Sequence, residues 1–133
     1  MATPCYCNNI RIASRKVSAL YDAGLAPFGI NIAQYSLLRL ISTHSPVSIT
    51  RLAHIAELER STVGRNITIL ERIKLVQTGR AENDRRETEV VLSDRGNQVL
   101  QEAVAAWQEC QTRLLSRVGE DKIAVLNSII DSL

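Results

Sequence analysis

The sequence predicts a mainly α-helical fold that carries one small β-hairpin. Aromatic residues make up only 4% of the 133 residues, whereas 45% are hydrophobic. The core must therefore be built from Leu, Ile, Val and Ala, and a core poor in aromatics favours helices over sheets. Apolar residues recur at steps of three and four along most of the chain, which is the spacing of one helix face. Only Thr88, Val90 and Leu92 follow the period of two that is typical of a strand.

The first two helices are marked by their ends. Thr3 is expected to cap the first helix, with Pro4 at its first position and Gly24 near its end. Its apolar face is Tyr6, Ile10, Ala13, Val17 and Leu20. Asn31 is expected to cap a second helix that runs to about Ser42.

A short helix and a longer helix follow, joined by a tight turn. Ser48 is expected to cap a helix over residues 49–56, and a turn at residues 57–59 leads into a helix over residues 60–74. The side chains expected to hold these two helices at a steep angle are Leu52, Ala53, Leu58 and Val63.

The rest of the chain predicts a hairpin and two more helices. Residues 75–80 and 86–92 are expected to form two strands around a polar tip. Ser93 then caps a long helix, and Gly119 separates it from a last short helix. The apolar stripe of the long helix is Val99, Ala103, Ala106, Cys110 and Leu114.

This order of elements predicts a winged helix-turn-helix, with further helices at both chain ends. The outer face of the 60–74 helix carries Ser61, Thr62 and Arg65, whose short hydroxyls and guanidinium suit a DNA major groove. The hairpin tip offers arginines to the DNA backbone or to a narrow minor groove. A solvated surface charge is the alternative interpretation of each arginine taken singly.

Three segments resemble the MarR family of regulators. Residues 58–66 resemble the recognition helix of that family. Residues 84–96 resemble its wing signature, D-x-R followed by V-x-L-[ST]-x-x-G, and residues 27–38 resemble the segment that leads into its second helix. The resemblance covers essentially the whole chain.

The resemblance implies a homodimeric transcription regulator that is commonly a repressor. A cytoplasmic location is expected because the N-terminal residues do not show the basic and then apolar pattern of a signal peptide. Such a regulator binds a pseudo-palindromic operator on double-stranded DNA and is released by a small ligand or by oxidation. By this match, Arg86 is the wing-tip arginine in the minor groove, and Asp84 is the carboxylate that orients it. The DNA-binding candidates are Ser61, Thr62, Arg65, Asn66, Thr68, Arg80, Arg85 and Arg86.

A dimer is also expected from the apolar stripes at the two chain ends. One small winged domain cannot bury them, and a monomer would expose a large apolar patch. We therefore expect a single domain over residues 1–133. The winged helix-turn-helix would span about 31–92, and the dimerisation helices about 4–23 and 94–133.

The three cysteines cannot form a closed set of disulfides within one chain, because their number is odd. Cys7 falls in the first turn of a helix, where a thiolate is favoured. Its segment resembles the organic-peroxide-sensing (OhrR-like) branch of the family, in which a cysteine at this position is oxidised. Tyr21 matches one of the two tyrosines near that thiol, and Arg11 occupies the position of the other. Cys110 is either a resolving thiol from the partner subunit or a small buried apolar side chain.

The other expected signal is a small aromatic or apolar acid bound between the dimer helices and the winged part. Arg15 and Arg39 are candidate polar contacts, together with Tyr21. No cofactor or metal is expected, because the C-x-C motif at Cys5 and Cys7 gives no recognised ligand spacing with the two histidines. No apolar run is long enough to cross a membrane.

Two other functions compete with DNA binding. A thiol peroxidase that uses Cys7 would need a supporting base, and neither histidine is near Cys7 in the sequence. A winged helix that binds protein would show an apolar or acidic recognition face. Ser61, Thr62 and Arg65 argue against such a face, whereas Ile69 and Glu59 would fit it. We therefore expect a regulator rather than an enzyme.

Overall fold

A computed structural model describes residues 2–133. Within this range the elements, in chain order, are α1 (Tyr6–Leu25), the short 3-10 helix η1 (Ala26–Phe28), α2 (Ile32–His44), β1 (Val47–Ser48), α3 (Ile49–Ala56), α4 (Arg60–Arg72), β2 (Val76–Arg80), β3 (Thr88–Leu92), α5 (Asp94–Val118) and α6 (Glu120–Ser132). The prediction of a mainly helical protein with a small β wing is confirmed.

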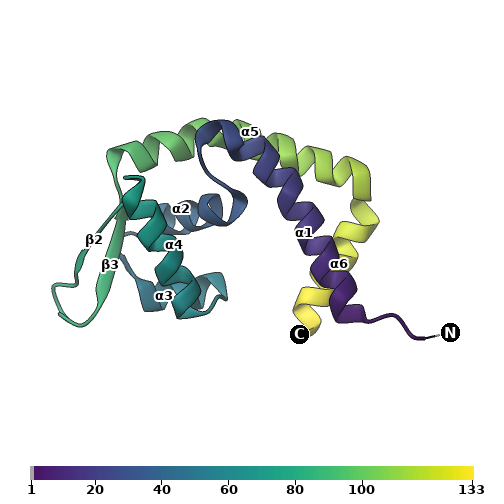
Figure 1. The fold of residues 1–133 in the computed structure, drawn as a ribbon, viewed down its shortest axis with the longest axis horizontal. Helices are drawn as coiled ribbons and strands as arrows, with labels where there is room; N and C mark the ends of the chain where they lie inside the picture. Colours follow the sequence, from purple (N-terminus) through teal and green to yellow (C-terminus); the bar gives the residue numbers. More distant parts are fainter. Residues whose placement is uncertain (1) are drawn as a thin grey trace.

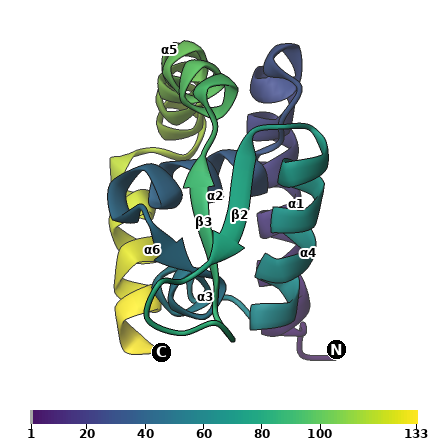
Figure 2. The ribbon, with the colours of Figure 1, turned by 90° about the vertical axis from the view of Figure 1, so that its left-hand side faces the viewer.

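Helix α5 forms a bar from which two groups of elements project (Figure 1). At one end, α2, α3, α4 and the β2–β3 hairpin form the winged part. At the other end, α1 and α6 extend from α5 in the same direction as the wing. Figure 2 shows that α1 and α6 lie on opposite sides of the molecule, so each presents a face that the other does not cover.

The wing belongs to a sheet of three strands in the order β1-β3-β2. Both pairings are antiparallel, with Val47 opposite Val90 and Thr78 opposite Val90 in the register. The prediction of two strands was incomplete, because β1 has only two residues and cannot show an alternating pattern. Its pairing to β3 ties the start of α3 to the wing.

The core is aliphatic and lies where α2, α3, α4 and α5 meet the sheet. Its fully buried members include Leu38, Ile41, Leu52, Leu70 and Val90. Leu52, Ala53 and Val63 are buried as expected for the side chains that hold α3 against α4. Leu58 is 46% exposed, so its predicted place in this contact was wrong. Glu57 adopts a left-handed conformation (φ 54°) at the end of α3, and the turn that follows it leaves Leu58 at the surface.

Four helix starts were expected from capping residues, and three are confirmed. Asn31, Ser48 and Ser93 each accept a hydrogen bond from a backbone N–H three residues on. Thr3 was wrong as the first cap. Cys5 has an extended backbone, its Sγ accepts from the N–H of Asn8 at 3.4 Å, and α1 begins after it.

Two helix ends also differ from expectation. Helix α1 continues to Leu25, and η1 with Gly29 at φ 74° then makes the turn towards α2. Helix α4 stops at Arg72, because Lys74 takes a left-handed conformation with φ 66°. This turn directs the chain from α4 into β2.

Candidate nucleic-acid interface

Helix α4 has one buried face and one open face. Val63, Ile67 and Leu70 are buried against the core. With about 3.6 residues per turn, Ser61, Arg65 and Thr68 then fall on the opposite side, and all three are exposed. Thr62 is half-buried beside them. The burial of one face therefore fixes which polar side chains the helix presents outward.

The start of α4 is held by two side-chain hydrogen bonds. The Arg65 guanidinium donates to the Thr62 hydroxyl at 3.4 Å. Nε of Arg60 donates to the Thr50 hydroxyl on α3 at 3.1 Å. Arg60 and Thr50 are exposed next to the predicted face but were not among the predicted candidates. Their contact joins residues ten positions apart on two helices, so no helical periodicity could have revealed it.

Thr68 and Asn66 use part of their hydrogen-bonding capacity within α4. The Thr68 hydroxyl donates to the Gly64 carbonyl at 3.0 Å and keeps its lone pairs for another donor. The Asn66 amide donates to the Thr62 carbonyl at 3.1 Å, and the side chain is half-buried. Asn66 therefore lies at the flank of the outer face, and Thr68 lies within it.

The wing loop brings three exposed arginines close together at the tip. Oδ1 of Asp84 accepts from the backbone N–H of Arg86 at 3.0 Å, and the Asp84 carbonyl accepts from Glu87. The Arg80 guanidinium donates to the Arg85 carbonyl at 3.3 Å. Asp84 thus shapes the turn that carries Arg86 and acts through the backbone of that arginine. The wing tip and the α3–α4 start project from the same end of the winged part (Figure 1).

An apolar groove of about 340 Å³ lies between α1, α2 and the α3–α4 turn. Its lining includes Ser18, Ile32, Leu37, Leu40, Leu58 and Asn66. A second hollow, lined by Arg39, shares Ser36 and Leu40 with it. The Arg39 guanidinium lies 4.3 Å from the ring centroid of Trp107, which itself stacks on Tyr35. Arg39 is therefore placed beside the groove, and Arg15 lies one turn before Ser18 on α1.

The predicted redox residues lie at two separate places in the chain. Cys7 is exposed in the first turn of α1, and Cys110 is buried on α5 with its Sγ 3.9 Å from the Leu20 carbonyl. Thirteen residues of helix separate Cys7 from Leu20, a span of about 20 Å. Cys7 and Cys110 of one chain therefore do not meet, so a Cys7–Cys110 disulfide would have to join two subunits.

Tyr21 lies beside Cys110. Its hydroxyl donates to Oε1 of Gln111. Burial raises the pKa of Tyr21, and the neighbouring Cys110 raises this pKa further. The phenol therefore keeps its proton at neutral pH and remains the donor of this α1–α5 contact.

Two further properties concern residues 2–133 as a whole. None of the helices there has the length and apolar character that a membrane crossing requires. No three His, Cys, Asp or Glu side chains in that range gather closely enough to hold a metal ion.

Comparison with known proteins places this geometry in a known group. The sequence model of the MarR family matches residues 30–88. The M. tuberculosis transcriptional regulator MosR, in a crystal structure of its complex with DNA, is 30% identical and superimposes with a TM-score of 0.82 over 97% of this chain and 98% of its own. The S. aureus MepR–DNA complex gives a TM-score of 0.84 at 22% identity, over 98% of this chain and all of that chain. An uncharacterised HTH-type transcriptional regulator of Bacillus subtilis, YhbI, is 23% identical over 92% of this chain and 80% of its own length.

Proposed function

The chain belongs to the MarR family, and on that premise we propose that it is a homodimeric, sequence-specific DNA-binding repressor. The observation that carries the proposal is the open face of α4 next to the arginine-bearing wing loop. Ser61 and Arg65 are exposed on α4, and Arg86 is exposed in the loop between β2 and β3. That loop and the start of α4 lie at the same end of the winged part (Figure 1). Helix side chains in the major groove can read base edges, and a wing arginine can bind in the flanking minor groove. The two elements together can therefore recognise a DNA sequence. The MosR and MepR structures that this chain resembles are complexes with DNA.

The solvent-accessible surface of the single chain is larger than expected for a compact monomer, which supports a dimer. The 14.8 kDa chain exposes 9519 Å², whereas a compact monomer of this mass exposes about 7,000 Å². Several large apolar side chains near the chain ends are exposed. Tyr6 on α1 is 71% exposed, and Leu126 and Ile130 on α6 are 48% and 59% exposed. A second copy that packs α1 and α6 across a two-fold axis would cover these faces.

A two-fold dimer also defines the DNA site. Two recognition helices related by the axis would enter successive major grooves, roughly 34–36 Å apart. The operator would then be a pseudo-palindrome whose half-sites repeat at that spacing. A regulator of this kind has to meet its operator DNA, so we place the protein in the cytoplasm.

The first test measures DNA affinity against salt and against Arg65→Ala. A dimer that neutralises about 6–10 phosphates loses on the order of a thousandfold or more in affinity between 50 and 200 mM salt. Arg65→Ala should weaken binding and relax the base preference at one position per half-site, at a cost of about 1–3 kcal/mol. Fluorescence anisotropy with a duplex selected from a random pool checks both results.

Arg95→Ala is the matched control for this test. Arg95 is exposed in the first turn of α5, which follows β3 at the base of the hairpin, whereas the wing tip lies at the other end of the hairpin (Figure 1). This control should bind like the wild type. Salt-independent binding, or equal losses for Arg65→Ala and Arg95→Ala, would overturn the assignment.

Release from DNA can come from a ligand in the apolar groove. The groove adjoins α1, the turn before α4 and Asn66 on α4, so a ligand there contacts both the dimer helices and the recognition helix. Its apolar lining and the adjoining guanidinium of Arg39 suit a small aromatic acid. Trp107, the only tryptophan of the chain, stacks on Tyr35 beside Arg39 and would report such binding by fluorescence.

Oxidation of Cys7 is the second proposed route of release. We expect an organic hydroperoxide to lower the DNA affinity of the reduced wild-type protein, because Cys7 is exposed on a helix of the proposed dimer interface. Cys7→Ser should keep its affinity under the same treatment, while Cys110→Ser reports whether the buried thiol takes part. Anisotropy before and after oxidant, together with non-reducing gels, measures the effect. Equal responses of wild type and Cys7→Ser would eliminate this route.

A further inference from the structure

The wing is attached firmly at its base and weakly beyond it. Val76, the first residue of β2, is buried in the core, but the other four residues of the strand are exposed. Strand β2 is also an edge strand, since it pairs only with β3 in the order β1-β3-β2. Backbone pairing ties all of β2 to β3, but beyond Val76 no buried side chain of β2 holds the strand against α4.

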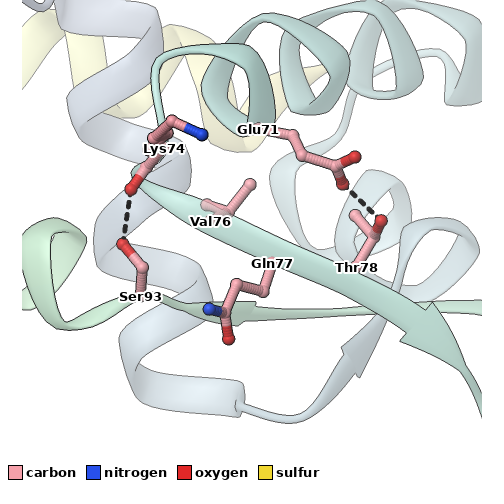
Figure 3. A pocket seen from close by; sticks show the side chains of 6 residues that line it. All are labelled: Glu71, Lys74, Val76, Gln77, Thr78 and Ser93. Carbon is pink, nitrogen blue, oxygen red and sulfur yellow. Dashed lines mark hydrogen bonds between the residues drawn. The ribbon is translucent and has the colours of Figure 1, made fainter.

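One hydrogen bond bridges this gap. The Thr78 hydroxyl of β2 donates to the Glu71 carboxylate near the end of α4, across a hollow of about 320 Å³ (Figure 3). Among residues 2–133, no other side-chain hydrogen bond joins α4, the proposed recognition helix, to β2 or β3.

Both partners of this hydrogen bond stand on anchored backbone. Glu71 follows Leu70, which is fully buried and fixes the rotation of α4. Thr78 lies opposite Val90 in the sheet, and Val90 is also fully buried. Side chains two residues apart share a face of a strand, so Thr78 continues the inward face of Val76. Two residues beyond Thr78 is Arg80, where the arginine-bearing part of the wing begins.

We propose that the Glu71–Thr78 pair positions the wing relative to the recognition helix and thereby sets how Arg86 meets DNA while α4 is in the major groove. The inference rests on the proposed DNA-binding function and adds a positioning pair to it. Neither residue touches DNA in this account. The pair fixes the angle at which the wing leaves the core, so that less conformational freedom is lost when both elements bind.

The hydrogen bonds at the base of the wing do not fix the angle between the wing and α4. The Ser93 hydroxyl donates to the Lys74 carbonyl at 2.6 Å, and the Ser93 N–H donates to the Leu75 carbonyl at 3.0 Å. These bonds hold the first residues of the β2 segment against the start of α5. They act before Val76, so they do not restrain the strand at Thr78.

The test is a double-mutant comparison on DNA affinity. Thr78→Val removes the hydroxyl but keeps the side-chain shape and a high strand propensity, so the melting temperature should not fall. We expect Thr78→Val to weaken binding to a duplex selected by the wild-type protein by about 3- to 10-fold, the scale of one hydrogen bond. Thr78→Ser should restore most of the affinity, and Glu71→Gln, which keeps an acceptor oxygen, should lose less than Glu71→Ala.

The coupling pattern separates a positioning role from a general loss of stability. If the wing is no longer held, Arg86→Ala should cost several-fold less in the Thr78→Val background than in the wild type. Arg65→Ala, on α4, should cost the same in both backgrounds. Additive costs at both arginines would overturn the positioning role, as would a Thr78→Val protein that binds like the wild type. If Arg65→Ala and Arg86→Ala had no effect in the wild type, the DNA-binding function itself would fail.

Discussion

Aspartate at both Leu126 and Ile130 of α6 is expected to convert the dimer into a monomer and to lower operator affinity by roughly a hundredfold to ten-thousandfold. The two side chains lie four residues apart on one face of α6 and are about half exposed in the single chain. Neither side chain belongs to the buried core of the protomer. A carboxylate in a closed apolar interface has no partner and is strongly disfavoured.

The loss of affinity follows from the loss of linkage between the two half-sites. When two DNA-binding units are joined, the second binds at a high effective concentration, which contributes about 10²–10⁴ to affinity. A monomer keeps one set of phosphate contacts, so the slope of log affinity against log salt should fall to about half. Sedimentation equilibrium and anisotropy titrations measure the two effects on the same samples.

Ser128→Asp is the matched control for this pair. Ser128 lies between the two positions in sequence and on the other side of α6, and it introduces the same carboxylate. This variant should remain dimeric and bind DNA normally. If the Leu126→Asp, Ile130→Asp protein stayed dimeric with full affinity, the dimer would have to use another surface.

The sequence predicted those parts of the fold that depend on neighbouring residues. Asn31 caps α2 because its side chain and that of Gln34 exchange hydrogen bonds with each other's backbone, a contact over three residues that a sequence motif records. The polar face of α4 was likewise predictable, because burial of Val63 and Ile67 at helical spacing fixes the orientation of Arg65. Local periodicity was sufficient for both.

Features that depend on distant segments were not predictable in this way. Strand β1 forms only because Val47 pairs with Val90, which lies more than forty residues later in the chain. The Arg60–Thr50 and Glu71–Thr78 hydrogen bonds each join two different elements, and single-element patterns carry no trace of them. Leu58 was misplaced because an apolar residue in a tight turn can point inward or outward, and the backbone conformation of Glu57 decides the outcome.

Gly96→Ala is expected to cost about 2–4 kcal/mol of stability, because it adds a methyl group where α5 touches the start of the wing segment. A Cβ at Gly96 would lie 1.9 Å from the Leu75 carbonyl oxygen and 3.0 Å from the Leu75 carbonyl carbon. The same oxygen accepts the hydrogen bond from the Ser93 N–H. The obstacle is backbone in a hydrogen-bonded junction, so it cannot turn aside as a flexible side chain could.

Gly64→Ala provides the comparison within the same chain. Gly64 also lies in a helix, but a Cβ there meets nothing within 4 Å. This substitution should raise stability by about 0.5–1 kcal/mol, because alanine has the better helix propensity. Thermal unfolding of the two variants should therefore shift in opposite directions, downward by roughly 10 °C or more for Gly96→Ala.

The position of Gly96 gives this result a meaning beyond stability. The start of α5 contacts the connection between α4 and β2, because Ser93 donates hydrogen bonds to the carbonyls of Lys74 and Leu75. The other end of α5 leads to the helices of the proposed dimer interface. A Gly96→Ala protein that still folds must move α5 away from this connection, which changes the placement of the winged part relative to the dimer axis. At temperatures at which the variant is still folded, its affinity for the selected duplex should therefore be lower than that of the wild type. Unchanged stability would show that the junction tolerates the methyl group, and the close contact of α5 with Leu75 would then not constrain the fold.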